Sequence, residues 1–191
     1  TMAILLVEQY FDFARELGCS FEEFGFAIVR DHVIDADLIA RAWADSRALF
    51  ALPEAVKLKY SIPGQGGARG YTPFGTERAK GAQVHDLKEF WHVGRTLAAD
   101  DPLAAFMPAN VWPAEAPAFR PTFEALYAAF EASGLRILQA IALHLGLARD
   151  FFVPTVEQGN SVLRLLHYPP LPPEAAGAVR AAAHEDINAI T

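Results

Sequence analysis

Cysteine is almost absent from this sequence: Cys19 is the only one in 191 residues. An internal disulfide is therefore excluded, and a reducing cytoplasm is the expected location. Basic residues are also scarce, with 16 Lys and Arg against 23 Asp and Glu and a formal charge of −7. Because a nucleic-acid-binding face must be basic to displace counterions from phosphates, this balance argues against a nucleic-acid partner. Small molecules are the expected partners, and the oligomeric state stays open.

A membrane-spanning or targeting segment is not expected at the start of the chain. The opening apolar run, residues 2–7, is too short to cross a bilayer and has neither a basic region before it nor a small-residue cleavage site. Hydrophobic residues make up 52% of the chain and charged residues only 20%. This composition is typical of a folded chain with a substantial core and not of a disordered one.

Apolar residues recur at helical spacing in three regions. They predict a helix over about residues 7–23, a second from Asp35 as its cap to about residue 52, and a third over 119–147, the longest. Gly18 indicates either a break in the first helix or a point of close packing. His144 is expected to be a helix-face or core residue that is satisfied by a local hydrogen bond.

Strands are predicted at residues 25–29, 86–93 and 161–168, where apolar, aromatic and β-branched residues cluster. The glycine-rich stretch 63–70 reads as a turn-rich loop that either lines a pocket or connects elements over the surface. Five prolines within 100–121 favour a surface linker without long regular structure. Helices early and strands later indicate an α+β domain.

The strongest candidate for chemistry is the pair His184 and Asp186. In a strand, side chains two residues apart share a face, so both could bind one ion. An imidazole and a carboxylate with open coordination positions suit non-haem Fe(II) in the two-His, one-carboxylate arrangement better than a closed zinc site. The zinc metalloprotease motif fails because Asn188 stands where it requires a second His. His85 precedes the strand at 86–93 and His92 lies near its end, but no carboxylate near them has a familiar ligand spacing.

Five stretches of the chain carry a family resemblance. The sequence resembles the isopenicillin N synthase-like branch of the 2-oxoglutarate and Fe(II)-dependent dioxygenases along nearly all of its length. The matching stretches, in this order, are residues 22–29, 69–71, 86–90, 163–170 and 184–191.

The resemblance implies a distorted jelly-roll, the double-stranded β-helix, with N-terminal helices packed outside it. Residues 1–160 would form the N-terminal helical and mixed α/β region, and residues 161–191 the first part of the jelly-roll, without its later strands. Fe(II) would be bound by His184 and Asp186. Tyr168 matches the family tyrosine that faces a carboxylate of the cosubstrate or substrate, although plant members carry an asparagine where this chain has Leu166.

The implied activity is oxidation of a small molecule by O2 with 2-oxoglutarate as cosubstrate, releasing succinate and CO2. The outcome would be hydroxylation, desaturation or ring closure, and Arg69 and Tyr71 are candidates for substrate binding. The family's second iron-binding His and its Arg-x-Ser would follow Thr191, and a start at Thr1 suggests trimming, so residues 1–191 alone are expected to be inactive. The alternatives are a binding module without a working iron site and a zinc hydrolase.

Overall fold

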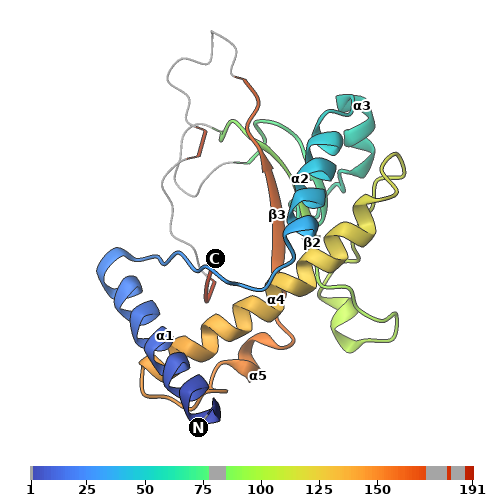
Figure 1. Ribbon diagram of the computed structural model, residues 1–191. Coiled ribbons are helices and arrows are strands. Elements are labelled where there is room, and N and C mark those ends of the chain that lie inside the picture. The colour runs from blue at the N-terminus through green and yellow to red at the C-terminus, as the bar shows by residue number, and fades with distance from the viewer. Residues whose placement is uncertain (1, 78–84, 171–179, 182–187) are drawn as a thin grey trace. The chain divides into compact units, whose positions relative to one another are not determined.

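The computed structural model of the protein describes residues 2–77, 85–170, 180–181 and 188–191 (Figure 1). The chain divides into two compact units. The first comprises Thr1–Asp35 and Ala128–Gly159, and the second comprises Ala36–Tyr127 and Asn160–Thr191. Helix α4, Phe119–His144, contributes residues to both units.

The first unit is helical. It contains α1, Met2–Phe24, the later turns of α4 and the short α5, Val153–Val156. Its core is built around the buried side chains of Ala14, Leu17 and Ala140. The helix predicted at 7–23 is therefore confirmed.

Gly18 lies within α1 at a point of close packing, and α1 continues through it. A Cβ at this position would overlap the imidazole of His144 on α4. His144 Nε2 contacts Glu22 Oε1 on α1 at 2.9 Å. The local hydrogen bond predicted for His144 is therefore wrong, because its partner is 122 residues away in the sequence.

We expect Gly18→Ala to destabilise the first unit by about 1–3 kcal/mol, the usual cost of overpacking a closed contact. Alanine in an exposed helix would instead gain about 1 kcal/mol over glycine, so the sign of the effect identifies the contact. Urea unfolding of Gly18→Ala measures it. The control is the double variant with His144→Ala, in which the obstacle is gone and Gly18→Ala should become neutral or stabilising. A Gly18→Ala protein as stable as the parent would contradict the packing described here.

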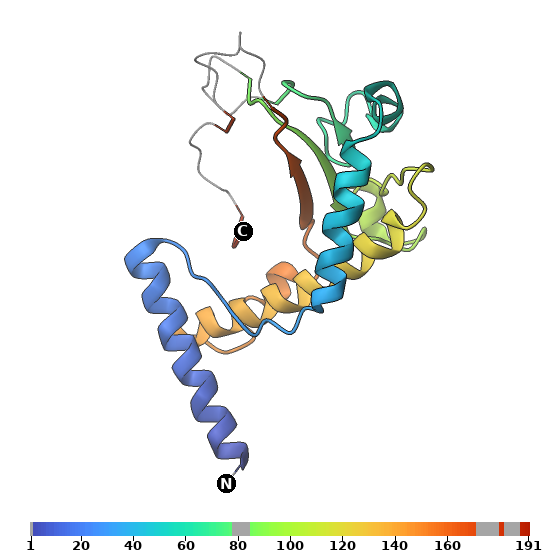
Figure 2. The same ribbon diagram turned by 45° about the horizontal axis from the view of Figure 1, so that its top comes forward.

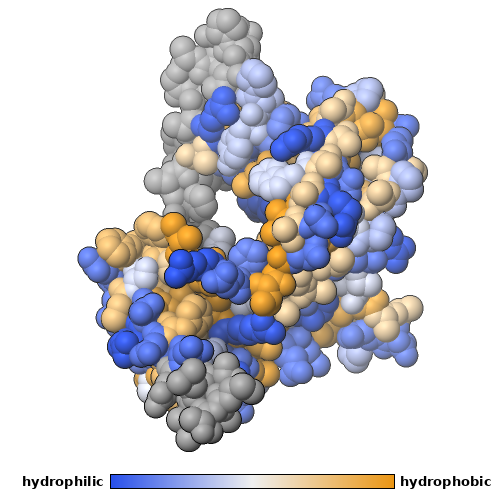
Figure 3. Space-filling model, viewed as in Figure 1, coloured by the Kyte–Doolittle hydropathy of each residue, from blue (hydrophilic) through white to orange (hydrophobic). Residues whose placement is uncertain are grey.

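The strand predicted at residues 25–29 is wrong. Residues 26–35 form an irregular segment after α1, and Asp31 and Val33 adopt positive φ values of 57° and 55°. No described strand pairs with this segment. Alternate side chains divide as they would in a strand: Ala27 and Val29 pack on the core, whereas Phe26 and Ile28 are exposed. Figure 3 shows the resulting hydrophobic surface around the end of α1.

The second unit combines helices with a small antiparallel sheet (Figures 1 and 2). Its helices are α2, Ala36–Phe50, which starts directly after Asp35 as predicted, α3, Glu54–Lys57, and the 3-10 turns Leu58–Tyr60 and Pro102–Ala105. Its strands are β1, Gly70–Thr72, β2, Glu89–Gly94, and β3, Val162–His167, in the order β1-β2-β3. The strands predicted at 86–93 and 161–168 and the α+β class are thus confirmed.

The two sides of this sheet differ in character. Tyr71, Glu89, Trp91, Leu165 and His167 share one side by strand alternation and register. This helix side is covered: the His167 ring stacks on Phe50 of α2, and Trp91 packs against Tyr60 and Phe119.

The opposite side, called the open side here, carries Thr72, Phe90, His92, Arg164 and Leu166. Arg164 keeps 39% of its side-chain surface and Leu166 is 45% exposed. Among the described residues of the second unit, this side therefore keeps two partly exposed side chains, one charged and one apolar.

Helix α4 carries the apolar pattern predicted at 119–147. Its first turns bury Phe119 and Phe123 in the second unit, and its later turns bury Leu138 and Ala142 in the first. Within the described residues it is the one helix long and apolar enough to cross a membrane.

The last described residues of the chain are held by a side-chain amide. Residues 188–191 form a bend in which Asn188 Nδ2 donates to the Ile190 carbonyl at 2.8 Å and to Thr191 Oγ1 at 2.7 Å. His184 and Asp186 lie outside the described residues.

Candidate functional site

Tyr168 follows β3 directly and is half-buried. Its backbone carbonyl accepts a hydrogen bond from Arg180 Nη1 at 3.4 Å. No three His, Cys, Asp or Glu side chains of the described part of the chain come together to bind a metal. His85 and His92 are therefore not part of a metal cluster there. The predicted roles of His184, Asp186 and Tyr168 stay predictions.

Glu89 is the centre of a buried polar cluster on the helix side of the sheet. Its Oε2 accepts hydrogen bonds from Lys57 Nζ at 2.7 Å and from the Tyr71 hydroxyl. Its Oε1 lies 2.6 Å from Nδ1 of His167, which pairs with Glu89 across the strands. Because a carboxylate can only accept, Nδ1 of His167 carries the hydrogen. The cluster connects α3 with all three strands.

The electrostatics of the Glu89 cluster follow from these contacts. Burial alone would raise the pKa of Glu89, but the hydrogen bonds from Lys57, Tyr71 and His167 outweigh it and hold the pKa below the usual value. Burial, together with the hydrogen bond to Glu89, raises the pKa of Tyr71. The Tyr71 phenol therefore stays protonated and occupied as a donor to Glu89.

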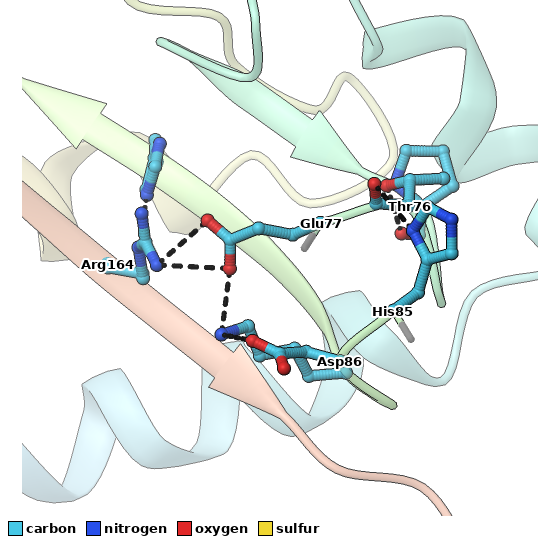
Figure 4. Close-up of polar contacts among 8 residues, drawn as sticks. Thr76, Glu77, His85, Asp86 and Arg164 are labelled. Atoms are coloured by element: carbon cyan, nitrogen blue, oxygen red, sulfur yellow. Dashed lines mark hydrogen bonds and ion pairs between the residues drawn. The ribbon is translucent and has the colours of Figure 1, made fainter. Parts of the chain in front are cut away.

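A second polar cluster lies next to the open side (Figure 4). Lys88 Nζ contacts Glu77 Oε2 at 2.7 Å and Asp86 Oδ2 at 2.9 Å, and its side chain is only 6% exposed. Burial would lower the pKa of Lys88, but the two carboxylates raise it above its usual value. His85 is separate from these ion pairs: its Nδ1 lies 3.2 Å from the carbonyl of Thr76.

Arg164 connects this cluster to His92. Its Nη1 lies 3.3 Å from Glu77 Oε1, and its Nε donates to His92 Nε2 at 2.6 Å. Since Nε2 accepts, Nδ1 of His92 must carry the hydrogen, which it donates to the Gly67 carbonyl at 2.6 Å. His92 is thus held as one neutral tautomer between β3 and the glycine-rich segment.

Burial of His92, followed by the positive charge of Arg164, lowers its pKa to about 4. The folded protein therefore favours the neutral His92 ring. Above the unfolded pKa of 6.5 the ring is neutral in both states, and as the pH falls from 6.5 toward about 4 the unfolded state takes up the proton first and the free energy of unfolding decreases. We expect the free energy of unfolding to fall by about 2 kcal/mol between pH 7 and pH 5 because of this residue.

Urea unfolding at the two pH values measures this effect. His92→Gln should flatten the dependence, whereas the control His85→Gln, at an exposed histidine, should keep it. An unchanged slope in His92→Gln would show that another group is responsible.

Arg69 and Tyr71, the candidates for substrate binding, both lie inside the second unit with 1% exposure. The Arg69 guanidinium donates from Nη1 to the Ala68 carbonyl at 2.7 Å and from Nη2 to Asn160 Oδ1 at 2.9 Å. It packs so closely on Gly94 that a Cβ there would overlap it. These contacts give both residues internal partners, and their role in substrate binding stays a prediction.

Sequence reasoning did not identify Glu89, His167 or Arg164 as site residues. A signal was present in Asp86, Lys88 and Glu89, three charged residues within a predicted strand that also carries Phe90, Trp91 and Val93. Charged side chains are rarely buried unless they are paired, so such a strand predicts internal ion pairs.

Comparison with known proteins gives the family of the chain. Residues 5–115, more than half of the chain, match the family model described as the N-terminal region of non-haem dioxygenases in morphine synthesis. Among named relatives, the proline hydroxylase buaE of Petromyces alliaceus is 32% identical over 94% of this chain and 57% of its own length. Validamycin A dioxygenase of Streptomyces hygroscopicus subsp. limoneus is 31% identical over 87% of this chain and 48% of its own length.

Solved structures agree with this result. A 2OG-Fe(II) oxygenase family protein from Caulobacter crescentus is 52% identical with a TM-score of 0.84, over 96% of this chain and 59% of that one. A full-length Neurospora crassa protein was solved in complex with α-ketoglutarate and thymine. It is 28% identical with a TM-score of 0.76, over 92% of this chain and 56% of that one. The chain thus spans little more than half the length of these proteins. On this evidence the chain belongs to the 2-oxoglutarate and Fe(II)-dependent dioxygenase family.

Proposed function

We propose that the protein oxidises a small-molecule substrate with O2, using Fe(II) and 2-oxoglutarate and releasing succinate and CO2. The observation that carries the proposal is the family membership given by residues 5–115 together with the 52% identity to a 2OG-Fe(II) oxygenase family protein. Relatives named for action on proline and validamycin A, and a neighbour bound to thymine, support a small molecule as the substrate. The reaction is a hydroxylation, desaturation or ring closure in a cytoplasmic protein.

The proposed architecture is the jelly-roll of this family. Residues 161–191, with β3, would form its first part. The strands β1 and β2 of the N-terminal region would extend the sheet, with the helices of residues 1–160 outside. The open side of the sheet would then face the reaction site, because the helix side is already covered. Tyr168, following His167 on β3, continues the alternation of Arg164 and Leu166 on the open side.

His184 and Asp186 would bind the iron. Their donor set, one imidazole nitrogen and one carboxylate, is the kind that Fe(II) accepts in oxygenases. Bound iron supplies the activation of dioxygen, and the protein supplies orientation and a dry environment. The Tyr168 hydroxyl would donate a hydrogen bond to a carboxylate of 2-oxoglutarate or substrate. Arg69 and Tyr71, which are buried with internal partners, would support the site from within the second unit and not by direct contact with the substrate.

The test is the release of succinate from 2-oxoglutarate by the purified full-length protein with Fe(II) in air. We expect succinate to form only when protein, Fe(II) and 2-oxoglutarate are all present, and to fall to background when Zn²⁺ replaces Fe(II). Protein that binds Fe(II) and 2-oxoglutarate without forming succinate would point to a binding module. Hydrolysis supported by Zn²⁺ alone would point to a hydrolase.

A further inference from the structure

His167 is the last residue of β3 and is held through its ring as well as its backbone. Its Nδ1 donates to Glu89 Oε1 at 2.6 Å, and its backbone pairs with that of Glu89 in the register of β2 and β3. Its ring stacks on Phe50 of α2, with the ring centres 5.1 Å apart and the planes 22° from parallel. Figures 1 and 2 both show α2 beside β3. The end of β3 is therefore fixed to its neighbouring strand and to a helix.

The contacts of His167 belong to a closed circuit of four residues. Lys57 Nζ donates to the Phe50 carbonyl at 3.1 Å and to Glu89 Oε2 at 2.7 Å. Glu89 Oε1 accepts from His167, and the His167 ring returns to the Phe50 ring. Lys57 and Glu89 are buried, with 6% and 5% exposure. Because each member contacts two others, none of them can shift without breaking a contact on one of its sides.

Stability alone does not explain why this circuit is built from charged groups. A buried ion pair costs the desolvation of both charges, and well-packed apolar side chains of similar volume are often as stable or more stable. Hydrogen bonds depend on direction, however, whereas apolar contacts do not. The circuit therefore sets the direction of the end of β3, which apolar packing would define less well.

Tyr168 depends on this strand end for its position. It follows His167 directly, and alternation along the strand puts its side chain on the open side, away from the His167 ring. Its carbonyl accepts from Arg180 Nη1 at the long distance of 3.4 Å. The next two residues, 169 and 170, are prolines, which have no backbone N–H and cannot continue the hydrogen-bonded ladder. The pairing of β2 and β3 ends at His167, so the position of Tyr168 is set from that residue.

We propose that Glu89 and His167 are positioning residues for Tyr168, because they fix the end of β3 so that the Tyr168 phenol points to a carboxylate of 2-oxoglutarate. The proposal rests on the proposed function, in which the Tyr168 hydroxyl donates to such a carboxylate. It adds a support for that side chain from the opposite side of the sheet, made by two residues that touch neither the cosubstrate nor the metal.

The test is calorimetric titration of 2-oxoglutarate into the anaerobic, Fe(II)-loaded, full-length protein. His167→Phe keeps a ring beside Phe50 and removes the donor to Glu89. This variant should fold, because Glu89 keeps Lys57 and Tyr71 as donors. We expect its dissociation constant to rise by about tenfold, the lower end of the usual effect of losing one charge-assisted hydrogen bond. His167→Asn, whose amide Nδ2 takes the place of the ring Nδ1, should keep most of the affinity.

A double-mutant cycle tests whether His167 acts through Tyr168. Tyr168→Phe removes the hydroxyl itself. If His167 acts by positioning that hydroxyl, the double variant of His167→Phe and Tyr168→Phe should bind 2-oxoglutarate as weakly as Tyr168→Phe alone and no more weakly. Losses of affinity that add up in the double variant would show that His167 acts on another part of the site, and they would refute the positioning role.

A stability control separates positioning from a loss of folding. Gly18→Ala, in the first unit, should lower the melting temperature and leave the dissociation constant unchanged. A purely structural role predicts the same result for His167→Phe, and that outcome would overturn the inference while the proposed function stood. Equal affinities of Tyr168→Phe and the parent would remove the role of Tyr168 and this inference together. A parent protein that bound no 2-oxoglutarate and released no succinate would instead overturn the proposed function itself.

Discussion

Replacing His184 or Asp186 by alanine is expected to abolish both iron binding and succinate release. In the proposed site each residue supplies one of only three protein donors, so its loss leaves the metal weakly bound. Loss of residues that merely orient a metal ligand already lowers affinity about 10–100-fold, so loss of a ligand should exceed about 100-fold. Iron content after dialysis and succinate release under standard conditions are the two measurements.

The control for this pair is Glu185→Ala. Glu185 stands between the two ligands in the sequence, and in a strand it would point to the other face. The Glu185→Ala variant removes a carboxylate from the same segment and should leave the iron content unchanged. Iron content that fell equally in all three variants would indicate a general effect on folding, and unchanged iron in His184→Ala and Asp186→Ala would remove the assignment.

The second large effect is expected at Glu89, where Glu89→Ala should lower the free energy of unfolding by about 3–5 kcal/mol. The reason is that Lys57, whose side chain is 8% exposed, would lose its carboxylate partner and remain as a buried unpaired charge. The Tyr71 hydroxyl and His167 Nδ1 would also lose their acceptor. Chemical denaturation of the variant and the parent at pH 7 measures the difference.

Two observations distinguish this effect from that of an ordinary ion pair. Glu124→Ala, which breaks the exposed pair with Arg120, should change stability by less than about 0.5 kcal/mol. Because folding lowers the pKa of Glu89, its contribution is present above the unfolded pKa of 4.5 and is lost as the pH falls through the folded pKa. A Glu89→Ala protein as stable as Glu124→Ala would contradict the buried cluster.

The helices and most strands could be predicted because their signals are local. The apolar spacing of residues 119–147 predicts α4, and the aromatic and β-branched residues of 86–93 and 161–168 predict β2 and β3. Residues 25–29 have the same local signal, yet they form no strand here. A strand needs a hydrogen-bonding partner as well as a pattern, and no described strand pairs with them.

The polar clusters could not be predicted in the same way because their members are far apart in the sequence. Glu89 meets Lys57, 32 residues away, and His167, 78 residues away. His92 looked like an isolated histidine, and only the register of β2 and β3 places Arg164 opposite it. His144 was expected to bond locally, and its partner Glu22 is set instead by the packing of α1 on α4. Each case depends on tertiary contacts, which spacing alone does not encode.

The contact between Gly18 and His144 has a consequence for how the two positions can change over evolutionary time. Because a Cβ at position 18 would overlap the imidazole, a larger residue at position 18 lowers stability while His144 keeps its ring. A substitution at position 18 becomes less costly after position 144 has lost its ring. Among relatives that keep this helix pair, the two positions should therefore covary, with glycine opposite an aromatic or imidazole ring and larger side chains opposite small ones.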